Sequence, residues 1–146
     1  MTEQNSFIKN KVKDYYWEDD INCATTMIKT LAEIFNIKID SQVINAATAM
    51  HGAGEYGAQC GLVEGTLMFI GIYGDMQKLE KTDVIKLCNK FAKEFETRYT
   101  SLLCKELRPE GFKEENPPHL CEDFTVEAIR FTKEFINREF KKQIMY

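Results

Sequence analysis

The sequence predicts an all-α fold, a compact single-domain bundle of five to seven helices. Apolar residues recur at intervals of three and four along most of the 146-residue chain, and no stretch shows the alternation typical of a strand. Hydrophobic residues make up 44% of the composition. A chain of this length buries roughly 68–70% of its unfolded surface. We therefore expect one helical domain over residues 1–146, without internal repeats.

The first half of the chain predicts three helices and a loop. The first helix is expected over residues 6–16, with its apolar side chains on one side. The acidic run 18–20 offers a cap and a favourable charge for a second helix, which stops near Asn36. Ser41 is a good cap for a third helix. Three glycines within residues 52–57 then predict a tight loop in place of further helix.

The next segment predicts the most buried helix of the bundle. Cys60 begins an apolar stretch that ends near residues 71–74, and Glu64 is its only charge over residues 61–70, so we expect it at the centre. Thr82 and Asp83 cap a following helix. Its expected core stripe consists of Val84, Ile85, Cys88, Phe91, Ala92, Phe95 and Tyr99.

The last part of the chain predicts a short turn, a polar loop and a final helix. The turn covers residues 104–107, and the charged loop 108–116 contains Pro109 and Gly111. Pro117 and Pro118 fit the start of the last helix, because a proline there removes no helical hydrogen bond. The apolar side of that helix is expected to contain Phe124, Ile129, Phe131, Phe135, Ile136 and Phe140.

Composition excludes some classes of function. The net charge of -4 and the pI near 5.3 argue against a nucleic-acid-binding protein, which usually has a basic face. The N-terminus lacks the pattern of a signal peptide, and the longest apolar run, Leu67–Tyr73, is far shorter than the ~20 residues that span a bilayer. We expect a cytoplasmic protein that does not bind membranes. Five cysteines in a reducing compartment then indicate metal or redox chemistry more than structural disulfides.

Four of the five cysteines fall at expected helix starts, namely Cys23, Cys60, Cys104 and Cys121. The unpaired N–H groups and partial positive charge at a helix start stabilise a thiolate and lower the pKa of its thiol. The fifth, Cys88, falls in the core stripe of its helix, as a small apolar residue would. We therefore predict one redox or metal-binding site formed by the first four cysteines.

The cysteine spacings leave other interpretations open. The intervals of 37, 44 and 17 residues match no compact C-x-x-C motif. The cysteines could be packing residues of a helical interaction module, for example a homodimer. They could also perform metal-free thiol–disulfide exchange, with Cys60 as the attacking thiol and Cys23 as the other candidate catalytic residue.

The residues around the cysteines resemble the C_GCAxxG_C_C family of redox-active proteins. The resemblance lies in Asn22-Cys23-Ala24, in Cys60-Gly61 with Gly65 four residues later, in Cys104–Leu107 and in Cys121, and it covers about residues 20–135. Leu62 departs from the alanine that the family favours after Cys-Gly. The resemblance implies an all-helical fold and a redox-active cysteine site. Related domains occur with iron–sulfur cytochromes, which favours a cluster.

The cysteines define a ligand set for an iron–sulfur cluster or another metal. Four thiolates can hold a [2Fe–2S] or [4Fe–4S] cluster or a tetrahedral zinc, and the sequence does not distinguish iron from zinc. Gly57, Gly61 and Gly65 are expected to let the backbone approach the sulfurs. The expected partner is an electron-transfer protein.

Other residues are secondary candidates. His51, His119 and Glu64 are candidate ligands or proton carriers. Trp17 and its neighbouring tyrosines are expected in core or interface surface.

Overall fold

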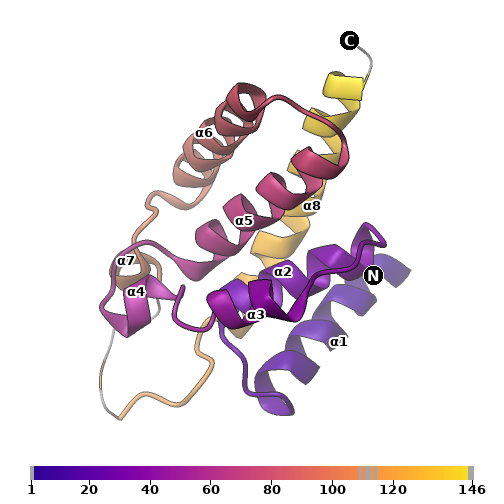
Figure 1. Ribbon diagram of the computed structural model, residues 1–146. Coiled ribbons are helices and arrows are strands. Elements are labelled where there is room, and N and C mark those ends of the chain that lie inside the picture. The colour runs from indigo at the N-terminus through magenta and orange to yellow at the C-terminus, as the bar shows by residue number, and fades with distance from the viewer. Residues whose placement is uncertain (1, 109, 111–112, 114, 145–146) are drawn as a thin grey trace.

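The computed structural model describes residues 2–108, 110, 113 and 115–144, and this part of the chain is all-α, as predicted (Figure 1). Five of its helices are longer than two turns: α1 (Glu3–Trp17), α2 (Cys23–Ile34), α5 (Gly61–Met76), α6 (Lys81–Tyr99) and α8 (Glu122–Ile144). Three are short: α3 (Ser41–Ala46), α4 (Gly52–Glu55) and α7 (Cys104–Leu107). No helix in the described ranges is long and apolar enough to cross a membrane.

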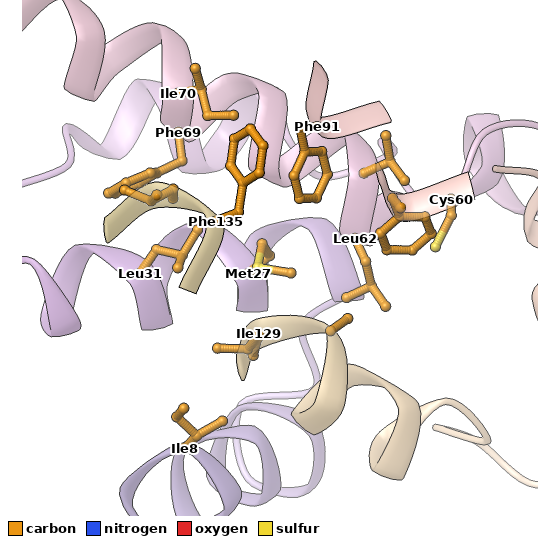
Figure 2. Close-up of a cluster of buried hydrophobic side chains, with 14 of the residues drawn as sticks. Ile8, Met27, Leu31, Cys60, Leu62, Phe69, Ile70, Phe91, Ile129 and Phe135 are labelled. Atoms are coloured by element: carbon orange, nitrogen blue, oxygen red, sulfur yellow. The ribbon is translucent and has the colours of Figure 1, made fainter. Parts of the chain in front are cut away.

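Helix α5 is central, as its apolar composition predicts. It packs against α2, α6 and α8, and α8 also contacts α1 and α2. Figure 2 shows the core between these helices, in which Met27, Phe69 and Phe135 are among the fully buried side chains. Cys60 lies at one end of this core, next to Leu62.

Gly65 lets α2 and α5 approach closely. A Cβ atom at this position would lie 2.5 Å from the carbonyl oxygen of Ala24, which is shorter than any normal contact. Only glycine therefore fits where the two helices cross near their starts. This crossing holds the beginning of α2, at Cys23, beside the beginning of α5.

Several helix boundaries differ from the predicted ones. The acidic run does not cap α2. Asn22 does, because its side chain accepts a hydrogen bond from the Thr25 N–H. Helix α8 begins at Glu122 and not at Pro117, because His119 adopts a left-handed φ of 60° that interrupts helical backbone.

The core stripe of α6 is also narrower than predicted. Ile85 is 66% exposed, because it lies to one side of the stripe formed by Leu87, Phe91 and Phe95. In the loop after α7, Pro109 and Gly111 lie outside the described residues.

Helix α4 is a single left-handed turn. Residues 52–55 all have positive φ, with Ala53 at 55° and Glu55 at 68°. The turn is closed by a 3.0 Å hydrogen bond from the Glu55 N–H to the His51 carbonyl. Left-handed backbone costs roughly 1–2 kcal/mol for each residue that is not glycine. The predicted glycine loop thus contains a defined and strained turn, which residues 56–59 separate from Cys60.

Candidate functional site

The four candidate cysteines all lie where helices begin, as predicted. Cys23 is the first residue of α2, Cys104 is the first residue of α7, and Cys60 is the N-cap of α5. Cys121 directly precedes α8, and its carbonyl accepts a 2.7 Å hydrogen bond from the Thr125 N–H. Each of these thiols is therefore next to backbone N–H groups that have no partner within their own helix.

Backbone hydrogen bonds hold Cys60 and Cys104 on neighbouring segments. The Cys60 N–H donates to the Leu102 carbonyl at 2.8 Å, and the Cys104 N–H donates to the Ala58 carbonyl at 2.7 Å. Residues 59 and 103 form an isolated antiparallel bridge between these bonds. The pairing brings together two cysteines that are 44 residues apart in the sequence.

A cavity of about 560 Å³ opens onto the cysteines. Cys23, Cys104 and Cys121 line it, whereas Cys60 is buried, with 4% of its surface exposed. The other side chains on its wall that carry a charge or can titrate are Tyr16, Asp20, His51, Glu55, Arg108 and His119.

The four thiols are close enough for a charge on one to act on another. Burial raises the pKa of Cys23 well above its usual value, and the neighbouring Cys60, Cys121 and Cys104 raise it further. All five cysteines of the chain are free thiols. One site therefore collects Cys23, Cys60, Cys104 and Cys121, from four separate segments.

The predicted lowering of the thiol pKa values at the helix starts is wrong. Burial raises the pKa of Cys60 to about 12, although hydrogen bonds from the Leu62 and Val63 N–H groups lower it. Loss of water around the buried sulfur outweighs the two backbone donors. The thiols are therefore protonated at neutral pH when no metal ion is bound.

Arg108 adds positive charge beside two of the sulfurs. Burial raises the pKa values of Cys104 and Cys121, and the guanidinium of Arg108 acts against this at both thiols. Glu55 raises the pKa of Cys104 further. Sequence reasoning did not single out Arg108, because no local pattern indicates which of the 19 basic residues faces the site.

The glycines around the site have different surroundings. A Cβ atom at Gly61 would lie 2.4 Å from the Cys23 Sγ, so its backbone touches that sulfur. Gly65 instead faces Ala24 and Met27, and the carbonyl of Gly57 accepts the Lys105 N–H at 3.1 Å. Gly52, which sequence reasoning did not select, lies against Cys104, because a Cβ atom there would be 3.2 Å from its Sγ.

Tyr16 and His119 form an aromatic wall of the cavity. Their rings stack with centroids 4.6 Å apart and an angle of 13° between the planes. The Tyr16 hydroxyl lies 2.6 Å from the Thr125 hydroxyl, and the ring is 2% exposed. Burial raises the pKa of Tyr16, and Cys23 raises it further. Tyr16 belongs to the aromatic run for which only core or interface surface was predicted.

The family model described as "Putative redox-active protein (C_GCAxxG_C_C)" matches residues 21–135, which contain all four of these cysteines. The chain belongs to this family. Comparison with curated proteins and with solved structures gave no match. The C_GCAxxG_C_C assignment agrees with the resemblance found in the sequence and identifies the protein as a member of a redox-active family.

The C_GCAxxG_C_C site fits a sulfur-bound centre in donor type, but it contains no preformed site for a single ion. Its four thiols supply the soft ligands that iron–sulfur clusters and zinc require. Within the described residues, however, no three cysteine, histidine or acidic side chains are grouped so that they could hold one metal ion.

His51, Glu64 and Cys88 take different positions around this site. His51 lines the cavity, with its Nε2 3.7 Å from a carboxylate oxygen of Glu55. Glu64 accepts a hydrogen bond from the Gln59 side chain. Cys88 lies in the middle of α6, and burial alone raises the pKa of its thiol. Cys88 is therefore a useful internal reference for the four clustered thiols.

Proposed function

We propose that this protein transfers electrons through an iron–sulfur cluster held by Cys23, Cys60, Cys104 and Cys121. The observation that supports this proposal is the convergence of four thiols from four segments, three of them on the wall of one cavity. Hydrophobic packing alone does not require four cysteines to lie together. Burial alone raises the pKa of Cys88, and none of the other four cysteines contributes to that shift.

The chemistry of the buried thiols supports a positively charged centre. Several thiolates in one buried place repel each other and lose their hydration, so they persist only beside a cation. A bound metal removes the proton from a coordinating thiol outright. The same four thiols that are protonated in the metal-free protein would therefore become ligands.

Related domains occur with iron–sulfur cytochromes, and this favours a cluster over zinc. Four thiolates suit either centre. When bound, a cluster would supply one-electron redox chemistry at a potential set by its surroundings.

The chain itself would adjust that potential. The N–H groups of Leu62 and Val63 point at the Cys60 sulfur, and Arg108 lies beside Cys104 and Cys121. Hydrogen bonds and positive charge both stabilise the more negative, reduced state. The core around Cys60 keeps water from one side, and the cavity leaves the other side accessible.

The test is anaerobic purification followed by visible spectroscopy and by iron, sulfide and zinc analysis. We expect coloured protein that contains iron and sulfide. Cys60→Ser and Cys104→Ser should lose the colour, whereas the matched control Cys88→Ser should keep it. A colourless protein with stoichiometric zinc, or equal iron in all variants, would contradict the proposal.

A second candidate is metal-free thiol–disulfide exchange between Cys23 and Cys60. Among the neighbouring thiols, Cys60 has the largest effect on the pKa of Cys23, which supports a close pair. Protein without metal would then lose two free thiols on mild oxidation and recover them on reduction, and Cys60→Ser would not. If neither metal nor a reversible disulfide is found, the four cysteines are packing residues of an interaction module.

A further inference from the structure

We propose that Trp17 and the carboxylates around it form the docking surface for an electron-transfer protein with a basic face. This Trp17 surface consists of Trp17, Glu18, Asp19, Asp20, Glu122 and Asp123. The inference rests on the proposed electron-transfer function and names the kind of partner that the cysteine site would serve.

Trp17 is held in a fixed orientation although half of it faces solvent. The indole is 52% exposed, and Trp17 is the only tryptophan of the chain. Its Nε1–H donates a 3.1 Å hydrogen bond to Glu122, and its ring meets the His119 ring edge-on, with centroids 5.1 Å apart. An exposed and immobilised tryptophan is typical of the residues that contribute most to protein interfaces.

Aromatic contacts connect this indole to the cysteine site. The His119 ring touches Trp17 with its edge and stacks on Tyr16 with its face. Tyr16 and His119 both line the cavity that contains Cys23 and Cys121. Packed aromatic side chains therefore lead from the surface to the wall of the cavity that Cys23 and Cys121 also line. A partner bound at Trp17 would lie close to the centre with which it exchanges an electron.

The charge around Trp17 identifies the partner. Glu18, Asp19, Asp20 and Asp123 are exposed, and Glu122 is half-buried. The sequence contains no lysine or arginine between Lys13 and Lys29, nor between Lys113 and Arg130. Asp20 lies 3.1 Å from the His119 Nε2, and none of the other four carboxylates forms an ion pair within the described residues. The surface is therefore negative, and it attracts a partner with a basic face.

The same charge disfavours other occupants. In a symmetric dimer, the surface would face its own copy, and the two sets of carboxylates would repel each other. Anionic lipid and nucleic acid are repelled for the same reason. A redox protein with lysines or arginines around an apolar contact patch complements both the carboxylates and the indole.

The single indole N–H provides a specific NMR signal for the test. ¹⁵N-labelled protein, both as purified and metal-free, is titrated with ferrous cytochrome c, a basic electron-transfer protein, and with flavodoxin, an acidic one. We expect cytochrome c to shift the Trp17 indole resonance at low salt, the shift to disappear at high salt, and flavodoxin to cause no shift. Because binding is measured with and without metal, the result does not depend on the cluster.

Matched variants separate docking from folding. Glu18→Lys with Asp19→Lys should weaken cytochrome c binding by roughly tenfold or more. Glu96→Lys should not, because Glu96 is exposed on α6, on the other side of the bundle from α1 (Figure 1). Trp17→Ala lacks the indole signal, so its binding is followed through backbone amide resonances. It should weaken binding, whereas Ile85→Ala, which removes another exposed apolar residue, should leave it unchanged. Iron content should be equal in all four variants.

Three outcomes would overturn the docking proposal. They are an unshifted indole resonance, unchanged affinity of the Glu18→Lys, Asp19→Lys variant, and a shift caused by self-association that disappears on dilution. If the protein contains iron and any of these results is found, the docking proposal is refuted and the proposed cluster is not. Protein without iron that binds cytochrome c at Trp17 would refute the cluster and keep the surface.

Discussion

The backbone of Gly61 lies directly against the sulfur of Cys23. A Cβ atom at Gly61 would be 2.4 Å from the Cys23 Sγ and 3.1 Å from the backbone nitrogen of Ala24. A side chain at this position requires the Cys23 sulfur to move and the nearby backbone to shift slightly. Because Cys60 directly precedes Gly61, the contact also determines how Cys23 and Cys60 face each other.

We expect Gly61→Ala to destabilise the protein by about 1–3 kcal/mol, because the added methyl group overpacks a fixed contact. It should also reduce iron content, since the Cys23 sulfur must move. Urea unfolding and iron analysis measure the two effects. Gly71→Ala is the control. Gly71 lies in the same helix with no atom near its Cβ position, and alanine there should stabilise the protein by about 0.5–1 kcal/mol.

The left-handed turn α4 predicts an unusual pair of substitutions. Ala53 has a φ of 55°, so Ala53→Gly should relieve left-handed strain and stabilise the protein by about 1 kcal/mol. Gly54→Ala should destabilise it by about 1–2 kcal/mol, although nothing lies within 4 Å of the added Cβ atom. The midpoints of urea unfolding measure both. Equal midpoints would mean that residues 52–55 are not left-handed in solution.

The buried pair of Tyr16 and Thr125 should contribute a measurable coupling between α1 and α8. Their hydroxyl groups are 2.6 Å apart, and both residues are almost fully buried. Each of Tyr16→Phe and Thr125→Val should destabilise the protein by about 1–2 kcal/mol, because the remaining hydroxyl loses its partner. The double variant should be less destabilised than the sum of the two, as a double-mutant cycle would show. Simple additivity would contradict the hydrogen bond.

Glu139 predicts a loss of stability in acid. Its carboxylate is bonded to Arg138 and Lys90, both at 2.8 Å, and to Lys142 at 3.3 Å. Although burial opposes the shift, these cations lower the pKa of Glu139 from 4.5 to about 2. The carboxylate therefore contributes its full stabilisation above pH 4.5, and this contribution is lost as the pH falls to about 2.

Glu139→Gln should remove that dependence. We expect the variant to be less stable at neutral pH by about 1–3 kcal/mol and to lose less further stability between pH 4.5 and 2. Urea unfolding at a series of pH values measures this difference. Glu134→Gln is a suitable control, since Glu134 is exposed on the same helix. Parallel pH curves for the wild type and Glu139→Gln would contradict the expectation.

Local patterns were sufficient to predict the longer helices and the cysteines at helix starts, but not the short turn α4. Helical periodicity and caps depend on neighbours in the sequence, so the starts at Cys23, Cys60 and Cys104 follow from short segments. The start of α8 was misplaced, because the prolines gave a stronger local signal than the left-handed His119. The residues around His119 gave no signal for its left-handed φ.

Features that depend on distant contacts could not be predicted. The raised thiol pKa values follow from burial, which the position of a cysteine within its own helix does not determine. The stack of Tyr16 on His119 joins residues about 100 positions apart. Arg108 acts on Cys104 and Cys121 only because the chain after α7 returns to the cavity.

The order of the four cysteines along the chain determines when their site is complete. Cys23 and Cys60 are synthesised well before Cys121, which directly precedes α8. Since α8 packs on α1, α2 and α5, the walls of the site are complete only once α8 has been made. Any cofactor that uses all four sulfurs must therefore be inserted into a chain that already contains α8.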